Sequence, residues 1–216
     1  MGRLTGAADG KGQRDMRALK TGIYALVLMA FISVSLPAQT PISGSISKLP
    51  SGTVSSLKEK AHTGNTEAQL RLGHAYWFGE GVDKNIDAAV GWFRIAADRG
   101  DPVAQTNLGY LYGAGAQGPA DAAEAAKWYL RAAVSGYPPA EYNLGLLYLG
   151  GDAVQKSEEQ AAYWIGKAAD AGFPAAIAGL GYVYATGQGV PKDSSKAEKL
   201  IRKAVKKNDP VAEMNL

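Results

Sequence analysis

The sequence predicts an all-α fold built from consecutive pairs of antiparallel helices. A Leu-Gly-x-x-Tyr motif recurs at a constant step of 36 residues, starting at Leu72, Leu108, Leu144 and Leu180. A second set of positions keeps the same step, namely Ala89, Ala125, Ala161 and Ala197, with Trp92, Trp128, Trp164 and Leu200. A single helical pair cannot bury its own apolar face, so repeats of this length stack into a solenoid.

The Leu-Gly-x-x-Tyr motif lies on the first helix of each unit, here called the A helix. In the first unit Ala68, Leu72 and Tyr76 recur at i, i+4 and i+8, which gives an apolar stripe with helical period. Prolines at 102, 138 and 174 stand where a helix tolerates a missing amide, at its first turn. Glycine inside a helix costs about 1 kcal/mol relative to alanine. Its recurrence in the motif therefore predicts close backbone contact with a neighbouring helix.

The second helix of each unit, the B helix, follows a glycine-containing turn. In the first unit Ala89, Trp92, Phe93 and Ala96 form its predicted inward face. Glycines at 100, 136 and 172 are predicted to end the B helices in a left-handed cap. The tryptophans in register are predicted to be core, whereas Trp77, outside that register, is predicted to be exposed.

Residues 113–118, GAGAQG, match the GxGxxG spacing of a phosphate-binding turn. That motif requires a strand before it and a helix after it, so that helix amides meet a pyrophosphate. Here it falls between a predicted A helix and a predicted B helix. We therefore interpret it as a structural turn and predict no nucleotide or other cofactor.

Residues 1–38 are predicted to be a signal peptide, with Met16 as an alternative start. Three basic residues precede the apolar run 21–36, and Ala38 offers a small residue for cleavage. The run is shorter than the roughly 20 residues of a membrane span. The predicted location is the periplasm, and the alternatives are secretion or anchoring in the inner membrane by an uncleaved leader.

Charge and cysteine content exclude several classes of function. Residues 1–38 carry five basic and two acidic side chains, and the remainder carries 18 of each, so the net charge of +3 belongs to the leader. No nucleic-acid partner is predicted. The chain has no cysteine, which excludes disulfides, thiolate metal sites and a cysteine nucleophile.

The body of the chain divides into a linker and an array. Residues 39–53 are rich in Ser, Gly, Thr and Pro and are predicted to be a flexible linker. The array is predicted over 54–216, with 55–65 as a preceding B helix. Its units are 65–100, 101–136, 137–172 and 173–208, followed by a partial fifth unit at 209–216, which repeats 101–108 with six identities in eight.

The repeated pattern A(E/Q)xxLGxxYxxGxGVxxDxxxAxxWxxxAAxxG resembles the Sel-one-like repeat, a relative of the tetratricopeptide repeat. Units two and three depart from it in the turn, at Gln117 and Ala153, and unit four departs at Leu200 and Asn208. The resemblance implies a right-handed α-solenoid whose A helices line a concave surface. It also implies a non-enzymatic adaptor that assembles protein complexes, tied in exported bacterial members to the envelope.

Residues for catalysis or metal binding are sparse. The only histidines are His62, predicted to be solvated, and His74, and neither has a second ligand at helical spacing. Glu158 and Glu159 are adjacent, so on a helix they point in different directions. No catalytic residue and no metal site is predicted.

The resemblance places a protein or peptide partner on the concave face, at A-helix positions flanking the motif. The residues predicted to bind it are Arg71, His74, Trp77, Phe78, Asn107, Tyr110, Tyr142, Asn143, Leu146 and Tyr182. They vary between units while Leu72, Gly73 and Tyr76 recur. A second predicted class is an immunity or inhibitor protein that occludes a toxin or hydrolase, and a hydrolase is the least favoured. The oligomeric state is left open.

A basic segment closes the fourth unit. Residues 192–207 carry seven basic and two acidic side chains. A solvated outer face and a docking site for an acidic partner or an anionic envelope surface are both consistent with this charge. Membrane contact is predicted only through this helix or an uncleaved leader.

Overall fold

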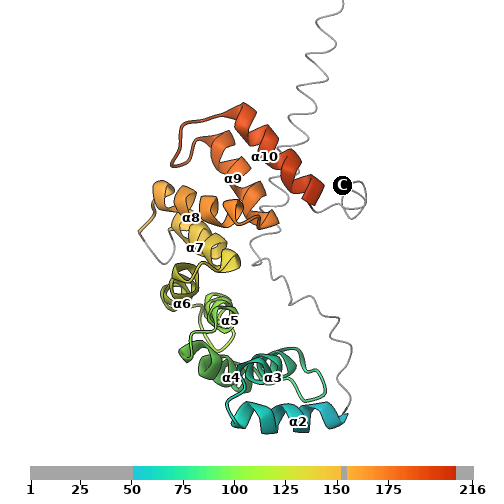
Figure 1. The fold of residues 1–216 in the computed structure, drawn as a ribbon. Coiled ribbons are helices and arrows are strands. Elements are labelled where there is room, and N and C mark those ends of the chain that lie inside the picture. The colour runs from blue at the N-terminus through green and yellow to red at the C-terminus, as the bar shows by residue number, and fades with distance from the viewer. Residues whose placement is uncertain (1–50, 152–154, 208–216) are drawn as a thin grey trace, which may run out of the picture. The chain divides into compact units, whose positions relative to one another are not determined.

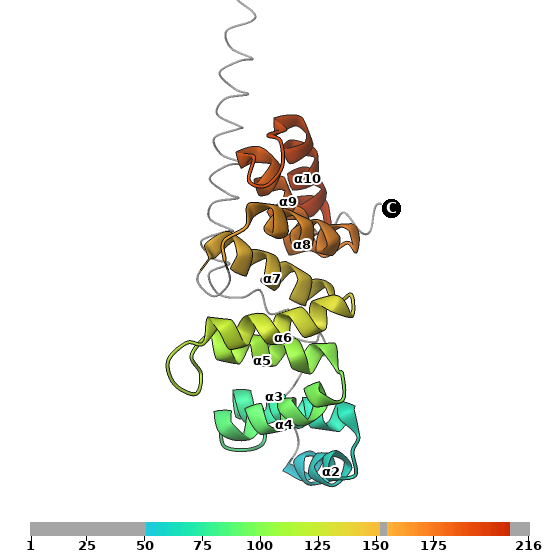
Figure 2. The same cartoon turned by 90° about the vertical axis from the view of Figure 1, so that its left-hand side faces the viewer.

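The computed structural model describes residues 51–151 and 155–207, and every regular element in these ranges is an α-helix (Figure 1). The A helices are α3 (Thr66–Phe78), α5 (Pro102–Gly113), α7 (Pro138–Gly150) and α9 (Pro174–Thr186). The B helices are α4 (Ile86–Asp98), α6 (Ala122–Val134), α8 (Glu158–Asp170) and α10 (Ser194–Lys207). Helix α2 (Ser51–His62) precedes them. Each helix packs on its neighbours in chain order along the stack (Figure 2). The predicted all-α solenoid of helix pairs is confirmed.

The array begins earlier than predicted. Helix α2 starts at Ser51, inside the predicted linker, and takes the place of a B helix in front of the first pair. Val54, Leu57 and Ala61 of α2 are buried against α3. The predicted signal peptide, most of the predicted linker and the partial fifth unit lie outside the described residues.

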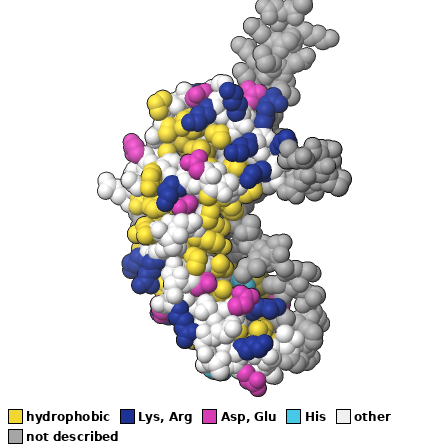
Figure 3. Space-filling model, viewed as in Figure 1, with side chains coloured by type: hydrophobic (Ala, Val, Ile, Leu, Met, Phe, Trp, Pro, Cys, Tyr) yellow, Lys and Arg dark blue, Asp and Glu magenta, His cyan; other side chains and the backbone are white. Residues whose placement is uncertain are grey.

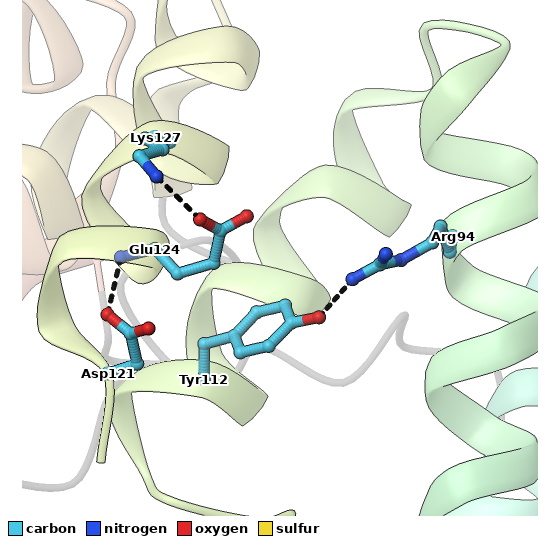
Figure 4. A network of polar contacts seen from close by, with 5 residues as sticks. All are labelled: Arg94, Tyr112, Asp121, Glu124 and Lys127. Carbon is cyan, nitrogen blue, oxygen red and sulfur yellow. Dashed lines mark hydrogen bonds and ion pairs between the residues drawn. The ribbon is translucent and has the colours of Figure 1, made fainter.

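The helix ends follow from local sequence. Asp121 caps α6 by accepting a hydrogen bond of 2.8 Å from the backbone N–H of Glu124 (Figure 4), which satisfies a donor that the helix itself leaves unpaired. Prolines stand in the first turn of α5, α7 and α9, as predicted. Gly100, Gly136 and Gly172 have φ of 89°, 82° and 85°, so the predicted left-handed ends of the B helices are confirmed.

The glycine of each motif leaves no room for a side chain between the two helices of a pair. A Cβ at Gly73 would lie 2.5 Å from the Phe93 ring, and one at Gly109 would lie 2.7 Å from the Tyr129 ring. In the third and fourth pairs the atoms in the way belong to Ile165 and Ile201, at 2.6 and 2.9 Å. The four obstructing side chains are themselves 36 residues apart. Backbone also lies close in the third and fourth pairs, where the carbonyl oxygens of Ala161 and Ala197 would be 3.2 and 3.3 Å from the added Cβ. The predicted close backbone contact is thus found in these two pairs, whereas in the first two an aromatic ring fills the space.

Adjacent units are joined by side-chain bonds across the stack. Gln69 donates to the carbonyl of Ala61, and Gln105 donates to that of Ala97, both at 3.0 Å. Arg94 on α4 donates to the hydroxyl of Tyr112 on α5 (Figure 4). These contacts fix α3 against α2 and α5 against α4.

The GxGxxG match is a turn between helices, as predicted. Gly113 ends α5, and Gly115 and Gly118 follow with φ of 66° and 148° before α6 begins. A Cβ at Gly115 would lie 2.7 Å from the Gly118 carbonyl oxygen. Helix α5, not a strand, precedes the match, so the geometry of a dinucleotide-binding turn is missing here.

The tryptophans differ from the prediction in one respect. Trp128 is buried, and Trp92 and Trp164 are partly buried. Trp77 was predicted to be exposed, and this is wrong, because only 8% of it is exposed. Tyr110 of the next A helix covers it, with ring centroids 5.3 Å apart.

Candidate partner-binding surface

The ten predicted surface residues lie on A helices, and burial separates them into two groups. Arg71 and Phe78 are exposed, and Asn107, Tyr110, Leu146 and Tyr182 are partly exposed. His74, Trp77, Tyr142 and Asn143 are buried, each at most 9% exposed. The first group can touch a partner directly, whereas the second can only support it.

An aromatic patch joins α3 and α5. Phe78 stacks on Trp77 with centroids 4.9 Å apart and planes 15° apart, and Trp77 in turn contacts Phe93 of α4 at 5.9 Å. Phe78 is 51% exposed although Trp77 beneath it is buried. We call Arg71, Trp77, Phe78 and Tyr110 the α3–α5 patch. It presents an exposed ring on a support that is packed into the core.

His74 lies beneath this patch and connects the first two units. Its Nε2 is 2.9 Å from Nδ2 of Asn107, so Asn107 donates when the imidazole carries its proton on Nδ1. The ring meets Phe93 edge-on, with centroids 5.1 Å apart. Burial lowers the pKa of His74 below its usual 6.5, which keeps the imidazole neutral near pH 7.

We expect His74 to make the fold sensitive to mild acid. Its pKa is lower in the folded state, so below about pH 6.5 the unfolded chain binds more protons and stability falls, at up to about 1.4 kcal/mol per pH unit. The change His74→Tyr, which installs the residue found one repeat later at Tyr110, should reduce this loss. Urea unfolding of both proteins at pH 7.0 and 5.5 measures it. Equal pH dependence in the two proteins would contradict the assignment.

Tyr142 belongs to the core rather than to the partner surface. It is 2% exposed and meets the Phe173 ring with centroids 5.7 Å apart. A Cβ at Gly179 of α9 would lie 3.0 Å from Cε2 of Tyr142. Burial raises the pKa of Tyr142 to about 12. The prediction that its side chain is available to a partner is therefore wrong, because it fills the space that Gly179 leaves in the next unit.

The sequence analysis did not predict the buried carboxylate of Glu141. Glu141 is 2% exposed, and its Oε1 lies 3.0 Å from Nζ of Lys167. It occupies the repeat position of Gln69 and Gln105, whose amides bond to the preceding B helix. A carboxylate has no proton to donate to such a carbonyl, so Lys167 supplies the compensating charge instead.

The described residues contain no cluster of three or more His, Asp or Glu side chains able to hold a metal ion. Glu158 and Glu159 lie in the first turn of α8, where acidic side chains favour a helix N-terminus. His62 is exposed, as predicted. Among the described helices none is both long and apolar enough to cross a bilayer.

The sequence of the chain matches a known family of repeat proteins. The Sel1 repeat model matches four times without a gap, at residues 66–101, 102–137, 138–173 and 174–209. The chain belongs to the Sel1 repeat family. The helix pairs that carry the matches are α3–α4, α5–α6, α7–α8 and α9–α10.

Solved structures share this architecture. A Sel1 repeat protein from Oxalobacter formigenes is 36% identical with a TM-score of 0.70, and the match covers 78% of this chain and 69% of that one. The protective antigen c5321 of uropathogenic Escherichia coli is 34% identical with a TM-score of 0.70, covering 74% of this chain. This Sel1 chain spans only 34% of the Escherichia coli protein. No match was found among curated protein sequences.

A more distant neighbour has a stated role. The immunity protein Pa5087 from Pseudomonas aeruginosa is 23% identical with a TM-score of 0.52, and the match covers 88% of this chain and 68% of that one. At this identity the likeness shows the fold alone. Sel1 repeat proteins are generally scaffolds for protein interaction and typically non-enzymatic, which agrees with the class predicted from the sequence.

Proposed function

We propose that this Sel1 repeat protein is a non-enzymatic scaffold of the bacterial envelope that binds a protein or peptide partner on its A-helix surface. The observation that carries the proposal is the α3–α5 patch, where the half-exposed Phe78 stacks on the buried Trp77. Arg71 is exposed about two turns before Phe78 on the same helix, and Tyr110 contributes from α5.

The energetics of the patch favour binding. An exposed phenylalanine keeps apolar area in water, and that area becomes favourable when a partner covers it. Phe78 already rests on a packed ring, so ordering it on binding costs little conformational entropy. Aromatic and arginine side chains are also the types enriched at the centres of protein interfaces. The patch therefore has both the composition and the rigidity of an anchor.

The envelope location rests on the leader. Residues 1–38 have the basic, apolar and small-residue order of an export signal. Export would bring the array to the periplasm, where a partner of the envelope would meet it. An immunity or inhibitor role would use the same surface, and the Pseudomonas aeruginosa neighbour supports it only at the level of fold.

Alanine substitutions in the patch test the proposal. Mature protein on a resin captures a partner from its native envelope, mass spectrometry identifies it, and titration then gives the affinity for Phe78→Ala, Arg71→Ala and Tyr110→Ala. Each change at a true anchor should weaken binding by over about 1 kcal/mol, or roughly fivefold.

Tyr163→Ala is the matched control, since Tyr163 is 55% exposed but lies on the B helix α8. It should bind like the unchanged protein. Patch variants that keep full affinity would contradict the proposal and direct attention to the B-helix face. Tyr142 and Asn143 are left unchanged because they are buried.

A further inference from the structure

Positive charge gathers on α10, unlike on the other B helices. The sequence of α10 holds six basic residues and a single acidic one, Glu198. In contrast, α4 and α8 carry more acidic than basic side chains, and α6 carries two basic residues and one acidic. The space-filling view shows the dark blue side chains clustered over the C-terminal pair (Figure 3). The charge therefore belongs to this helix and not to the repeat.

Three of the six basic side chains have structural roles. Lys196 donates to the hydroxyl of Tyr184 at 2.6 Å, and Lys207 donates to the carbonyl of Gly172 at 3.0 Å. Arg202 pairs with Glu198 at 2.8 Å. The first contact joins α10 to α9, and the second joins it to Gly172, just after the end of α8. The third lies within α10.

The other three are Lys199, Lys203 and Lys206, which we call the lysine stripe. All three are exposed, and across the described residues none of them makes a hydrogen bond or an ion pair. They stand at i, i+4 and i+7, so they share one face of the helix. Like charges at this spacing repel each other and destabilise an isolated helix. Within residues 51–151 and 155–207, no ion pair with an acidic side chain offsets this repulsion.

The opposite face of α10 is already occupied. Ala197, Ile201 and Ala204 are buried, and Ile201 packs closely against Gly181 of α9. Val205, 66% exposed, is then the one large exposed hydrophobic side chain of α10. A single valine offers little apolar area to a bilayer, and three lysines alone give only weak attraction to an anionic membrane. Carboxylates held at matching spacing could instead pair with the lysines one by one.

We propose that the lysine stripe is a second docking surface, for an acidic segment of a partner protein whose carboxylates repeat at i, i+4 and i+7. It is separate from the α3–α5 patch, which lies in the first and second units, whereas α10 closes the fourth. A partner that engages both surfaces would be held along the array. Charge complementarity determines this second contact, so its affinity falls as salt rises.

Fluorescence anisotropy with a synthetic probe tests the stripe directly. The probe is a labelled alanine-based helical peptide with glutamate at i, i+4 and i+7, and the reference peptide has glutamine at those positions. The stripe variant is Lys199→Gln with Lys203→Gln and Lys206→Gln. The control is Lys60→Gln with Lys84→Gln and Lys127→Gln, which removes the same charge from exposed sites elsewhere.

The stripe variant should bind the glutamate peptide roughly tenfold more weakly, because it loses three exposed ion pairs of modest strength. The control should lose less than about twofold, and circular dichroism should show both variants folded. Equal losses in the two variants, or equal binding of the glutamine peptide, would overturn the proposal. Tighter binding to vesicles with anionic phosphatidylglycerol, lost in the stripe variant, would assign the stripe to a membrane and also overturn it. Phe78 and Tyr110 are intact throughout, so failure here leaves the α3–α5 proposal standing.

Discussion

Replacing Gly73 with alanine is expected to lower the free energy of unfolding by about 1–3 kcal/mol, the usual cost of overpacking a core. The new Cβ would lie 2.5 Å from Cε1 of Phe93, and Phe93 has no exposed surface. The rings of His74 and Trp77 also contact Phe93. Phe93 therefore has no space to move into, and α3 must separate from α4.

Gly91→Ala is the matched control in the same pair. Gly91 lies inside α4, and no atom stands within 4 Å of a Cβ placed there. Alanine should therefore raise the free energy of unfolding by about 0.5–1 kcal/mol, since it removes only the entropic cost of a helical glycine. Urea unfolding followed by circular dichroism compares the two variants. If both stabilise the protein, close packing at the motif glycine is not what holds a pair together.

Replacing Lys167 with methionine is expected to lower the free energy of unfolding by about 1–3 kcal/mol. The change keeps most of the aliphatic stem but leaves the carboxylate of Glu141 buried without its cation. Because 39% of the Lys167 side chain is exposed, solvent screens the pair and the cost falls short of a fully buried one. Part of the loss also comes from the Trp164 ring, 4.9 Å from Nζ.

A double-mutant cycle separates these contributions. Glu141→Gln installs the side chain found at Gln69 and Gln105, which can donate to the preceding B helix. In that background Lys167→Met should cost under about 1 kcal/mol, since the ion pair is gone and the contacts with the Trp164 and Tyr163 rings remain. The same measurement of urea unfolding applies. An unchanged cost in the two backgrounds would mean that Lys167 does not compensate Glu141.

The fold was predictable because equivalent residues of all four units recur at the same 36-residue step. Gly73 and Phe93 belong to one unit and recur together every 36 residues, so their contact could be inferred from the cost of a helical glycine. The left-handed ends of the B helices followed in the same way, because Gly136 and its equivalents act on neighbouring backbone. Local rules and periodicity agreed at the left-handed ends of the B helices, whereas α2 begins inside the predicted linker.

Burial on the A-helix face was not predictable from position alone. Tyr142 shares its repeat position with the small Ala178, and its burial depends on Gly179 in the next unit. Trp77 is covered by Tyr110, which also lies one unit further on. Such contacts depend on how the side chains of two adjacent units differ in size. A repeat pattern describes what the units share and not how they differ. The sequence could therefore place these residues on A helices but could not show which of them are accessible.

A signal for Glu141 was present in the sequence. Its repeat position reads Gln69, Gln105, Glu141 and Ile177, and an isoleucine in phase with polar residues indicates a buried site. The cation was harder to find, because Lys167 shares its position with Ile95, Arg131 and Lys203. Only the structure shows that Lys167 reaches Glu141.

Site-specific photo-crosslinking tests the proposed binding surface most directly. A benzophenone side chain replaces Phe78 on α3, or Tyr163 on α8, both of which are about half exposed. After irradiation with the captured partner, mass spectrometry counts covalent adducts at each position. The account predicts adducts from position 78 and few or none from position 163. Adducts at 163 with none at 78 would contradict it, because the partner would then lie on the B helices.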